Sequence, residues 1–127
     1  MNTGSEDKIP FNESSVAAIS DNYMQQMIAK TKNYCIVILK ATPKRKESGM
    51  DKIVWEHGRR NFALRNGGLL PIVCPVTDAS EVSGIGIFDL DLEQTKKIMD
   101  QDPGVQVGIF TYEIYTCRSF PGSKLPE

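Results

Sequence analysis

The sequence has little excess charge and no long apolar segment. Its 127 residues carry 15 Lys and Arg against 16 Asp and Glu, a net charge of -1. Such a balance gives no long-range field for nucleic acid or anionic lipid, so we expect neither as a partner. The longest apolar run, 34–39, is far shorter than the roughly 20 residues that span a bilayer. We therefore expect no membrane association.

The sequence also shows no sign of secretion and few cysteines. Residues 2–7 are polar and lack the basic and apolar regions of a signal peptide. The three cysteines, Cys35, Cys74 and Cys117, are odd in number and lie in apolar, strand-like stretches, where a reduced thiol behaves as a small hydrophobe. We expect a cytoplasmic protein without disulfides.

What is present is the composition of one soluble globular domain, with 40% hydrophobic and 24% charged residues. We expect an extension over 1–32 in which residues 1–11 have no regular structure. Asn12 then offers a cap to one amphipathic helix, because apolar residues recur at helical spacing. They are Val16, Ile19, Tyr23 and Met27. We expect this helix to pack on the domain or on a dimer mate.

After the extension, the pattern alternates between strand and helix. The expected elements are a strand at 34–39, a charged loop at 42–49, a helix at 50–66, strands at 69–76 and 82–90, a helix from Asp91 to the Asp-Pro-Gly at 102–104, and a strand at 105–117. This order predicts an α+β, ferredoxin-like βαββαβ domain over 33–120, followed by a tail at 121–127. Its four-stranded antiparallel sheet would carry helices on one face.

The strand at 34–39 is apolar at every position, so both of its faces need cover. Helices on one face of the sheet would leave the other face apolar. A homodimer is the simplest way to cover it.

His57 is the only histidine of the chain. It follows Ile53 by four residues and Val54 by three, which directs the ring toward the buried side of its helix or the border of that side. A histidine exchanges protons readily near neutral pH, so His57 is a candidate general acid or base. The alternative is a histidine at the edge of the core that only satisfies hydrogen bonds.

Several segments together resemble the YciI-related (YCII) family over roughly 33–118. They are Glu-His-Gly at 56–58, Asn-Gly-Gly-Leu-Leu at 66–70, Ile-Gly-Ile-Phe at 85–88 with the following Asp91, and Asp-Pro-Gly-Val-Gln-Val-Gly-Ile-Phe at 102–110. The helical His and the Asp-Pro that ends the second helix are the most specific of these features. Relatives usually begin at the first strand, so the N-terminal helix is an addition.

The resemblance implies a ferredoxin-like fold that is usually dimeric and related to the dimeric α+β barrel proteins. A paired His and Asp suggest an enzymatic role for the family, and one branch is a dehydrochlorinase of a chlorinated hydroxyquinol. By position, the His is His57 and the Asp is Asp102.

Asp102 would lie at the negative end of a helix dipole, which disfavours a carboxylate, so its presence needs another reason. It could accept backbone N–H groups and shape the Pro-Gly turn, or it could orient His57 and fix its tautomer. Both can hold together. Gly84, Gly86 and Gly108 are expected inside strands, where they could open a small substrate-binding cavity beside His57.

Other chemistry has weaker support. The cysteines lack the close spacing of zinc sites, and no cofactor motif is present, so we expect neither a metal nor a cofactor. Cys74 or Cys117 as a nucleophile beside His57 is less well supported than inert packing.

The leading hypothesis is an enzyme in which His57, oriented by Asp102, moves a proton on a small organic ligand in a lyase or isomerase reaction. The competing hypothesis is a dimeric ligand-binding or interaction module of the same fold that does not catalyse a reaction.

Overall fold

The computed structural model describes residues 8–127 and divides the chain into two units. The larger unit, Asn33–Cys117, contains the sheet and the helices that pack on it. The smaller unit combines the N-terminal segment up to Lys32 with Arg118–Glu127. No helix in the described part of the chain is long and apolar enough to cross a membrane.

Two short helices follow Asn12, where the sequence predicted one. Helix α1 spans Glu13–Ala17 and begins at the predicted Asn12 cap, and α2 spans Asp21–Ala29. A second cap explains the break, because the Ser20 hydroxyl accepts the backbone N–H of Tyr23 at 3.0 Å and starts a new helix. The expected single helix over this segment is therefore wrong.

The side chains of α1 and α2 are not buried in the chain. Val16, Ile19 and Tyr23 are each about half exposed, so packing of these helices on a dimer mate stays a prediction. Of the segment expected to lack regular structure, 1–7 lie outside the described residues. Residues 8–11 contain no helix or strand.

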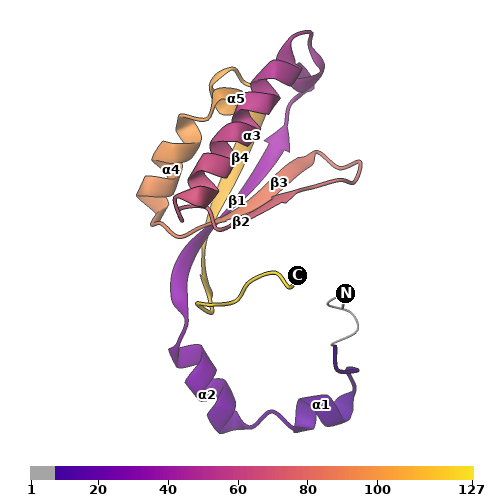
Figure 1. The fold of residues 1–127 in the computed structure, drawn as a ribbon, viewed down its shortest axis with the longest axis vertical. Helices are drawn as coiled ribbons and strands as arrows, with labels where there is room; N and C mark the ends of the chain where they lie inside the picture. The colour runs from indigo at the N-terminus through magenta and orange to yellow at the C-terminus, as the bar shows by residue number, and fades with distance from the viewer. Residues whose placement is uncertain (1–7) are drawn as a thin grey trace. The chain divides into compact units, whose positions relative to one another are not determined.

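Four strands form one antiparallel sheet in the order β2-β3-β1-β4, which confirms the predicted α+β, ferredoxin-like fold (Figure 1). Their bounds are Lys32–Ala41 for β1, Ile72–Pro75 for β2, Val82–Phe88 for β3 and Phe110–Ser119 for β4. The most apolar strand, β1, lies inside the sheet between β3 and β4, as its composition predicted.

Helix α3 spans Met50–Asn66, the bounds that its sequence pattern predicted. The chain leaves the helix because Gly68 adopts a φ of 77°, a conformation that side chains disfavour. Phe62 of this helix is 68% exposed. It follows Gly58 by four residues and so lies toward the border of the helix face that meets the sheet.

The charged loop before α3 contains a short 3-10 helix, η1, over Pro43–Lys46. After the β2–β3 hairpin, α4 spans Leu92–Asp100. Asp91 caps this helix, because its carboxylate accepts the N–H of Gln94 at 2.8 Å.

The segment 105–109, which was expected to open the last strand, does not do so. Asp102 caps a further short helix, α5, over Pro103–Gln106, because its carboxylate accepts two backbone N–H groups and Pro103 suits the first helical position. Gly108, at a φ of 83°, then turns the chain toward β4. Gly108 therefore lies outside the strands, contrary to the prediction, whereas Gly84 and Gly86 lie in β3 as expected.

The core lies on the side of the sheet that the helices cover (Figure 1). Alternate residues of β1 are buried there, as the two-residue period of a strand requires. The buried hydrophobic residues are Cys35, Val37, Leu39, Leu70, Phe88, Met99, Ile109 and Phe110. This core holds α3 and α5 next to each other and so brings position 57 close to position 102.

Candidate functional site

His57 lies in the middle of α3 on the side that meets the core, as its spacing from Ile53 and Val54 predicted. Its side chain is 13% exposed. The imidazole ring is tilted by 51° against the ring of Phe110, and the two ring centroids are 4.9 Å apart. The ring is therefore held by packing and retains an edge toward solvent.

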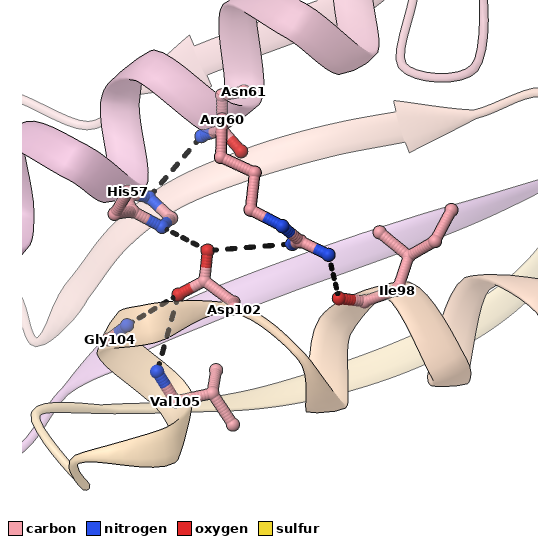
Figure 2. Close-up of polar contacts among 7 residues, drawn as sticks. All are labelled: His57, Arg60, Asn61, Ile98, Asp102, Gly104 and Val105. Carbon is pink, nitrogen blue, oxygen red and sulfur yellow. Dashed lines mark hydrogen bonds and ion pairs between the residues drawn. The ribbon is translucent and has the colours of Figure 1, made fainter.

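Asp102 is 1% exposed and meets His57 from α5 (Figure 2). Its Oδ1 lies 2.7 Å from His57 Nδ1. Its Oδ2 accepts the N–H of Gly104 at 2.9 Å and that of Val105 at 3.2 Å. Both geometries considered for Asp102 are thus present, because one oxygen shapes the turn and the other contacts the imidazole.

The ionisation of Asp102 fixes the hydrogen-bonding pattern of the pair. Burial raises the pKa of Asp102, but the hydrogen bond and charge of His57 and the N–H groups of Val105 and Gly104 outweigh it, so the pKa lies below its ordinary value. An ionised carboxylate can only accept hydrogen bonds. His57 Nδ1 therefore carries the hydrogen, and in the neutral ring Nε2 keeps a free lone pair.

Asn61 contacts the other side of the same ring. Its Nδ2 lies 3.3 Å from His57 Nε2, one helical turn further along α3 (Figure 2). An amide N–H donates to an unprotonated nitrogen, so this contact agrees with the tautomer that Asp102 selects. A ligand that offers a proton to Nε2 would take the place of this long hydrogen bond.

Arg60 approaches Asp102 from the same helix (Figure 2). Its Nη2 donates to the carbonyl of Ile98 at 2.8 Å, which ties α3 to the end of α4. Its Nη1 lies 3.8 Å from Asp102 Oδ1 and has no hydrogen-bond partner among the described residues. The guanidinium thus places a positive charge beside the buried carboxylate.

The position of Asp102 corrects the reasoning about the helix dipole. Asp102 follows the end of α4, but it is also the N-cap of α5, where backbone N–H groups point at the carboxylate. A carboxylate is favourable at such a position. The presence of Asp102 therefore has a local explanation in addition to its contact with His57.

A cavity of about 620 Å³ opens beside His57, between α3 and the sheet. The α3 residues that line it follow helical spacing and are Val54, His57, Gly58, Asn61, Phe62 and Arg65. From the sheet, Val37, Leu39, Val73, Pro75, Gly84 and Gly86 line it. Two of the three glycines proposed for substrate binding thus line this cavity, and Gly108 does not.

Three glycines, at positions 58, 84 and 86, line the cavity and have no side chains that could fill it. Gly84 and Gly86 occupy positions of β3 that pair with the core-facing Leu39 and Val37. A Cβ on Gly86 would come within 2.9 Å of Leu70, so close packing accounts for that glycine. A Cβ on Gly58 would meet nothing within 4 Å, so no packing contact requires a glycine in the middle of α3.

The cysteines and possible metal ligands do not build a second site. Cys74 lines the cavity, but Cys117 does not, and burial together with the nearby Cys35 raises the pKa of the Cys117 thiol. A raised pKa lowers the fraction of reactive thiolate. Among residues 8–127, no three His, Cys, Asp or Glu side chains are grouped so that they could hold a metal ion.

Comparison with known proteins adds no identification. No protein-family model matches the chain, and no curated protein is significantly similar to it. The fold and the site define it as an α+β protein with a four-stranded antiparallel sheet and a buried His57–Asp102 pair beside a cavity.

Proposed function

We propose that the chain is an enzyme that moves a proton on a small organic molecule, with His57 as the general acid and base and Asp102 as its positioning residue. The observation that supports this most directly is the 2.7 Å contact between His57 Nδ1 and a carboxylate that is 1% exposed. It leaves Nε2, which accepts only the long hydrogen bond of Asn61, as the unprotonated basic nitrogen of a ring that lines the cavity.

The proposed cycle balances without a cofactor. His57 Nε2 takes a proton from a C–H or O–H of the substrate, and the resulting imidazolium is stabilised by the Asp102 carboxylate. The imidazolium then returns the proton to a different atom in an isomerase step, or to a leaving group in a lyase step. Asn61, released from Nε2, would donate its amide hydrogen bond to the bound substrate.

We also propose that the chain is a divergent relative of the YciI-related family. The element order and the position of a His on the first helix of the sheet domain support this relation, as does the Asp-Pro that follows the second helix. The site residues all fall within 33–120, which we propose as the functional domain, with 1–32 as an extension and 121–127 as a tail.

A test of the base uses a substrate that reports proton removal. A nitro-substituted benzisoxazole loses its ring C–H proton to a base, its N–O bond breaks, and a coloured phenolate forms. We expect the protein to accelerate this reaction about 10²-fold over free imidazole at the same pH, which is the low end of general-base catalysis.

His57→Gln is the decisive variant because it removes the only imidazole of the chain. We expect its rate to fall to the background of buffer. A variant that reacts as fast as the wild type would show that His57 is not the base. Saturable binding of the benzisoxazole without any reaction would favour the ligand-binding module instead.

We further propose that the chain forms a homodimer through the face of the sheet that the helices leave uncovered. The strand register places isoleucines on that face, and Ile85 is 39% exposed. They are Ile36, Ile38, Ile72, Ile85 and Ile87. Sedimentation equilibrium should give twice the 14.1 kDa of one chain, and a mass of 14.1 kDa at micromolar concentration would contradict the proposal.

A further inference from the structure

We infer that the ligand of the cavity beside His57 is a small organic acid whose carboxylate binds Arg65 and whose apolar body, about the size of one ring and a short chain, packs between α3 and the sheet. This inference rests on the proposed function, because it takes that cavity as the place where the substrate binds. Four features of the cavity support it.

Arg65 belongs to the lining of the cavity and to the same helix as His57. The two residues are eight positions apart, which is about 12 Å along the helix axis. Helical side chains lean toward the N-terminus, so a side chain as long as that of Arg65 can reach back toward His57. A ligand can therefore contact both residues if it carries its anion a few bonds away from the reacting atom.

Arg65 is the lining arginine whose charge is not compensated. Arg45 also lines the cavity, but its Nη1 donates to Asp51 at 2.9 Å. Among residues 8–127, the side chain of Arg65 has no hydrogen-bond or ion-pair partner. An unpaired guanidinium presents two parallel N–H groups that match a carboxylate.

The charges differ between the two ends of the cavity. Ala41 donates its N–H to the carbonyl of Glu81, so the β2–β3 turn lies beside the end of β1. That end of the cavity contains Asp78, which would repel a carboxylate ligand, and Arg45, whose charge is paired with Asp51. Arg65 is at the other end, near the point where α3 leads into β2. A carboxylate is therefore favoured at the Arg65 end.

The rest of the cavity lining is mostly apolar. It includes Val37, Leu39, Val54, Leu70, Val73, Phe88, Met99 and Phe110. A volume of about 620 Å³ is within the usual range for small-molecule sites. Because a highly polar ligand would leave its own groups without partners against these walls, an amphipathic acid fits better.

Two matched compounds test this inference. Hydrocinnamate carries a carboxylate on a short chain and a phenyl ring, and hydrocinnamide has nearly the same shape without the charge. We expect NMR titration of nitrogen-labelled protein to shift cavity residues such as Gly58, Asn61 and Gly84. The acid should bind about tenfold more tightly than the amide, because a hydrogen bond to a charged partner is lost in the amide.

Arg65→Gln and Arg59→Gln form a matched pair of variants. Both remove one positive charge from α3, but Arg59 is paired with Glu56 and does not line the cavity. We expect Arg65→Gln to weaken binding of the acid about tenfold and to leave the amide unchanged. Arg59→Gln should bind both compounds as the wild type does.

Three results would overturn the inference. They are equal affinity of the wild type for acid and amide, equal loss of acid binding in both variants, and failure of the acid to bind with a Kd of about 10 mM or lower. The outcome is separate from that of the proposed function. Arg65-dependent binding in a protein that shows no His57-dependent proton transfer would support this ligand class and contradict the catalytic proposal.

Discussion

Asp102→Asn tests the central pair with the smallest change of shape. The substitution keeps the size of the side chain and replaces one carboxylate oxygen by an NH₂ group. Because Asp102 has contacts on both oxygens, the structure dictates which way the new amide must point. The direction of the amide in turn decides which ring nitrogen of His57 carries the hydrogen.

The amide oxygen has to stay with the backbone. In the wild type, one oxygen of Asp102 accepts the N–H groups of Gly104 and Val105, and these donors are fixed by α5. An NH₂ group there would face two N–H donors. The asparagine therefore turns its NH₂ toward His57 Nδ1, which must then accept a hydrogen bond. The neutral ring is left with its hydrogen on Nε2, the atom proposed as the base.

The expected loss of activity is large and the expected loss of stability is moderate. Holding a catalytic histidine in the wrong tautomer lowers turnover by about 10⁴-fold in serine proteases. That factor exceeds the acceleration of about 10²-fold expected here, so we expect the rate of benzisoxazole elimination in Asp102→Asn to fall to that of His57→Gln. The variant keeps two hydrogen bonds to the backbone but loses a buried charge beside Arg60. We expect the free energy of unfolding to fall by about 1–3 kcal/mol, which most domains tolerate.

The assay is unusually direct because the chain has a single histidine. Long-range proton–nitrogen NMR correlations distinguish the two neutral tautomers, and every imidazole signal belongs to His57. We expect the Nδ1–H form in the wild type and the Nε2–H form in Asp102→Asn. Urea denaturation of both proteins gives the change in stability.

Asp100→Asn is the matched control. It removes the same charge from the end of α4, but Asp100 contacts Lys96 and Tyr112 and not His57. We expect this variant to keep the tautomer and the rate of the wild type. Retention of the Nδ1–H tautomer and of full activity in Asp102→Asn would refute the assignment of Asp102 as the positioning residue.

Three further predictions concern packing and pH. Gly104→Ala should lower the free energy of unfolding by about 1–3 kcal/mol in urea denaturation, because the new Cβ would lie 2.4 Å from the Phe110 ring that packs on His57. Gly58→Ala should raise the free energy of unfolding by roughly 1 kcal/mol, because alanine is the better helix former and nothing obstructs its Cβ. Burial and the hydrogen bond to Asp100 raise the pKa of Tyr112 to about 12, so its contribution to stability should be full below pH 10 and disappear as the pH rises through about 12. Ultraviolet titration should show this late tyrosinate, and Tyr112→Phe should remove it.

The sequence was sufficient for the elements whose pattern is strong. The apolar run at 34–39 gave the inner strand, and the helical spacing from Met50 to Asn66 gave α3 with its ends. The apolar pattern predicted the wrong boundaries where a single side chain decides the local structure. The Ser20 hydroxyl divides the N-terminal helix, and the Asp102 carboxylate starts α5 before β4 begins. Such caps compete with the apolar pattern that suggested a continuing helix or strand.

The two residues of the pair could be proposed from the sequence, but their neighbours were missed. Asn61 and Arg60 follow His57 by four and three residues, so helical spacing alone would have placed both beside it. Their polar character gave no sign of function, because such residues are common on exposed faces of helices. Their importance depends on the closeness of α5, which was itself not predicted.

Gly58 helps to decide between a catalytic histidine and one that only fills the edge of the core. A glycine inside a helix costs about 1 kcal/mol relative to alanine, and at position 58 no packing contact explains that cost. Its neighbour in sequence is His57, and both line the same cavity. Helix stability is thus lowered at a point where a side chain would narrow the cavity that His57 lines. Local rules are most often broken in this way at functional sites, and a histidine that served only the core would need no such space.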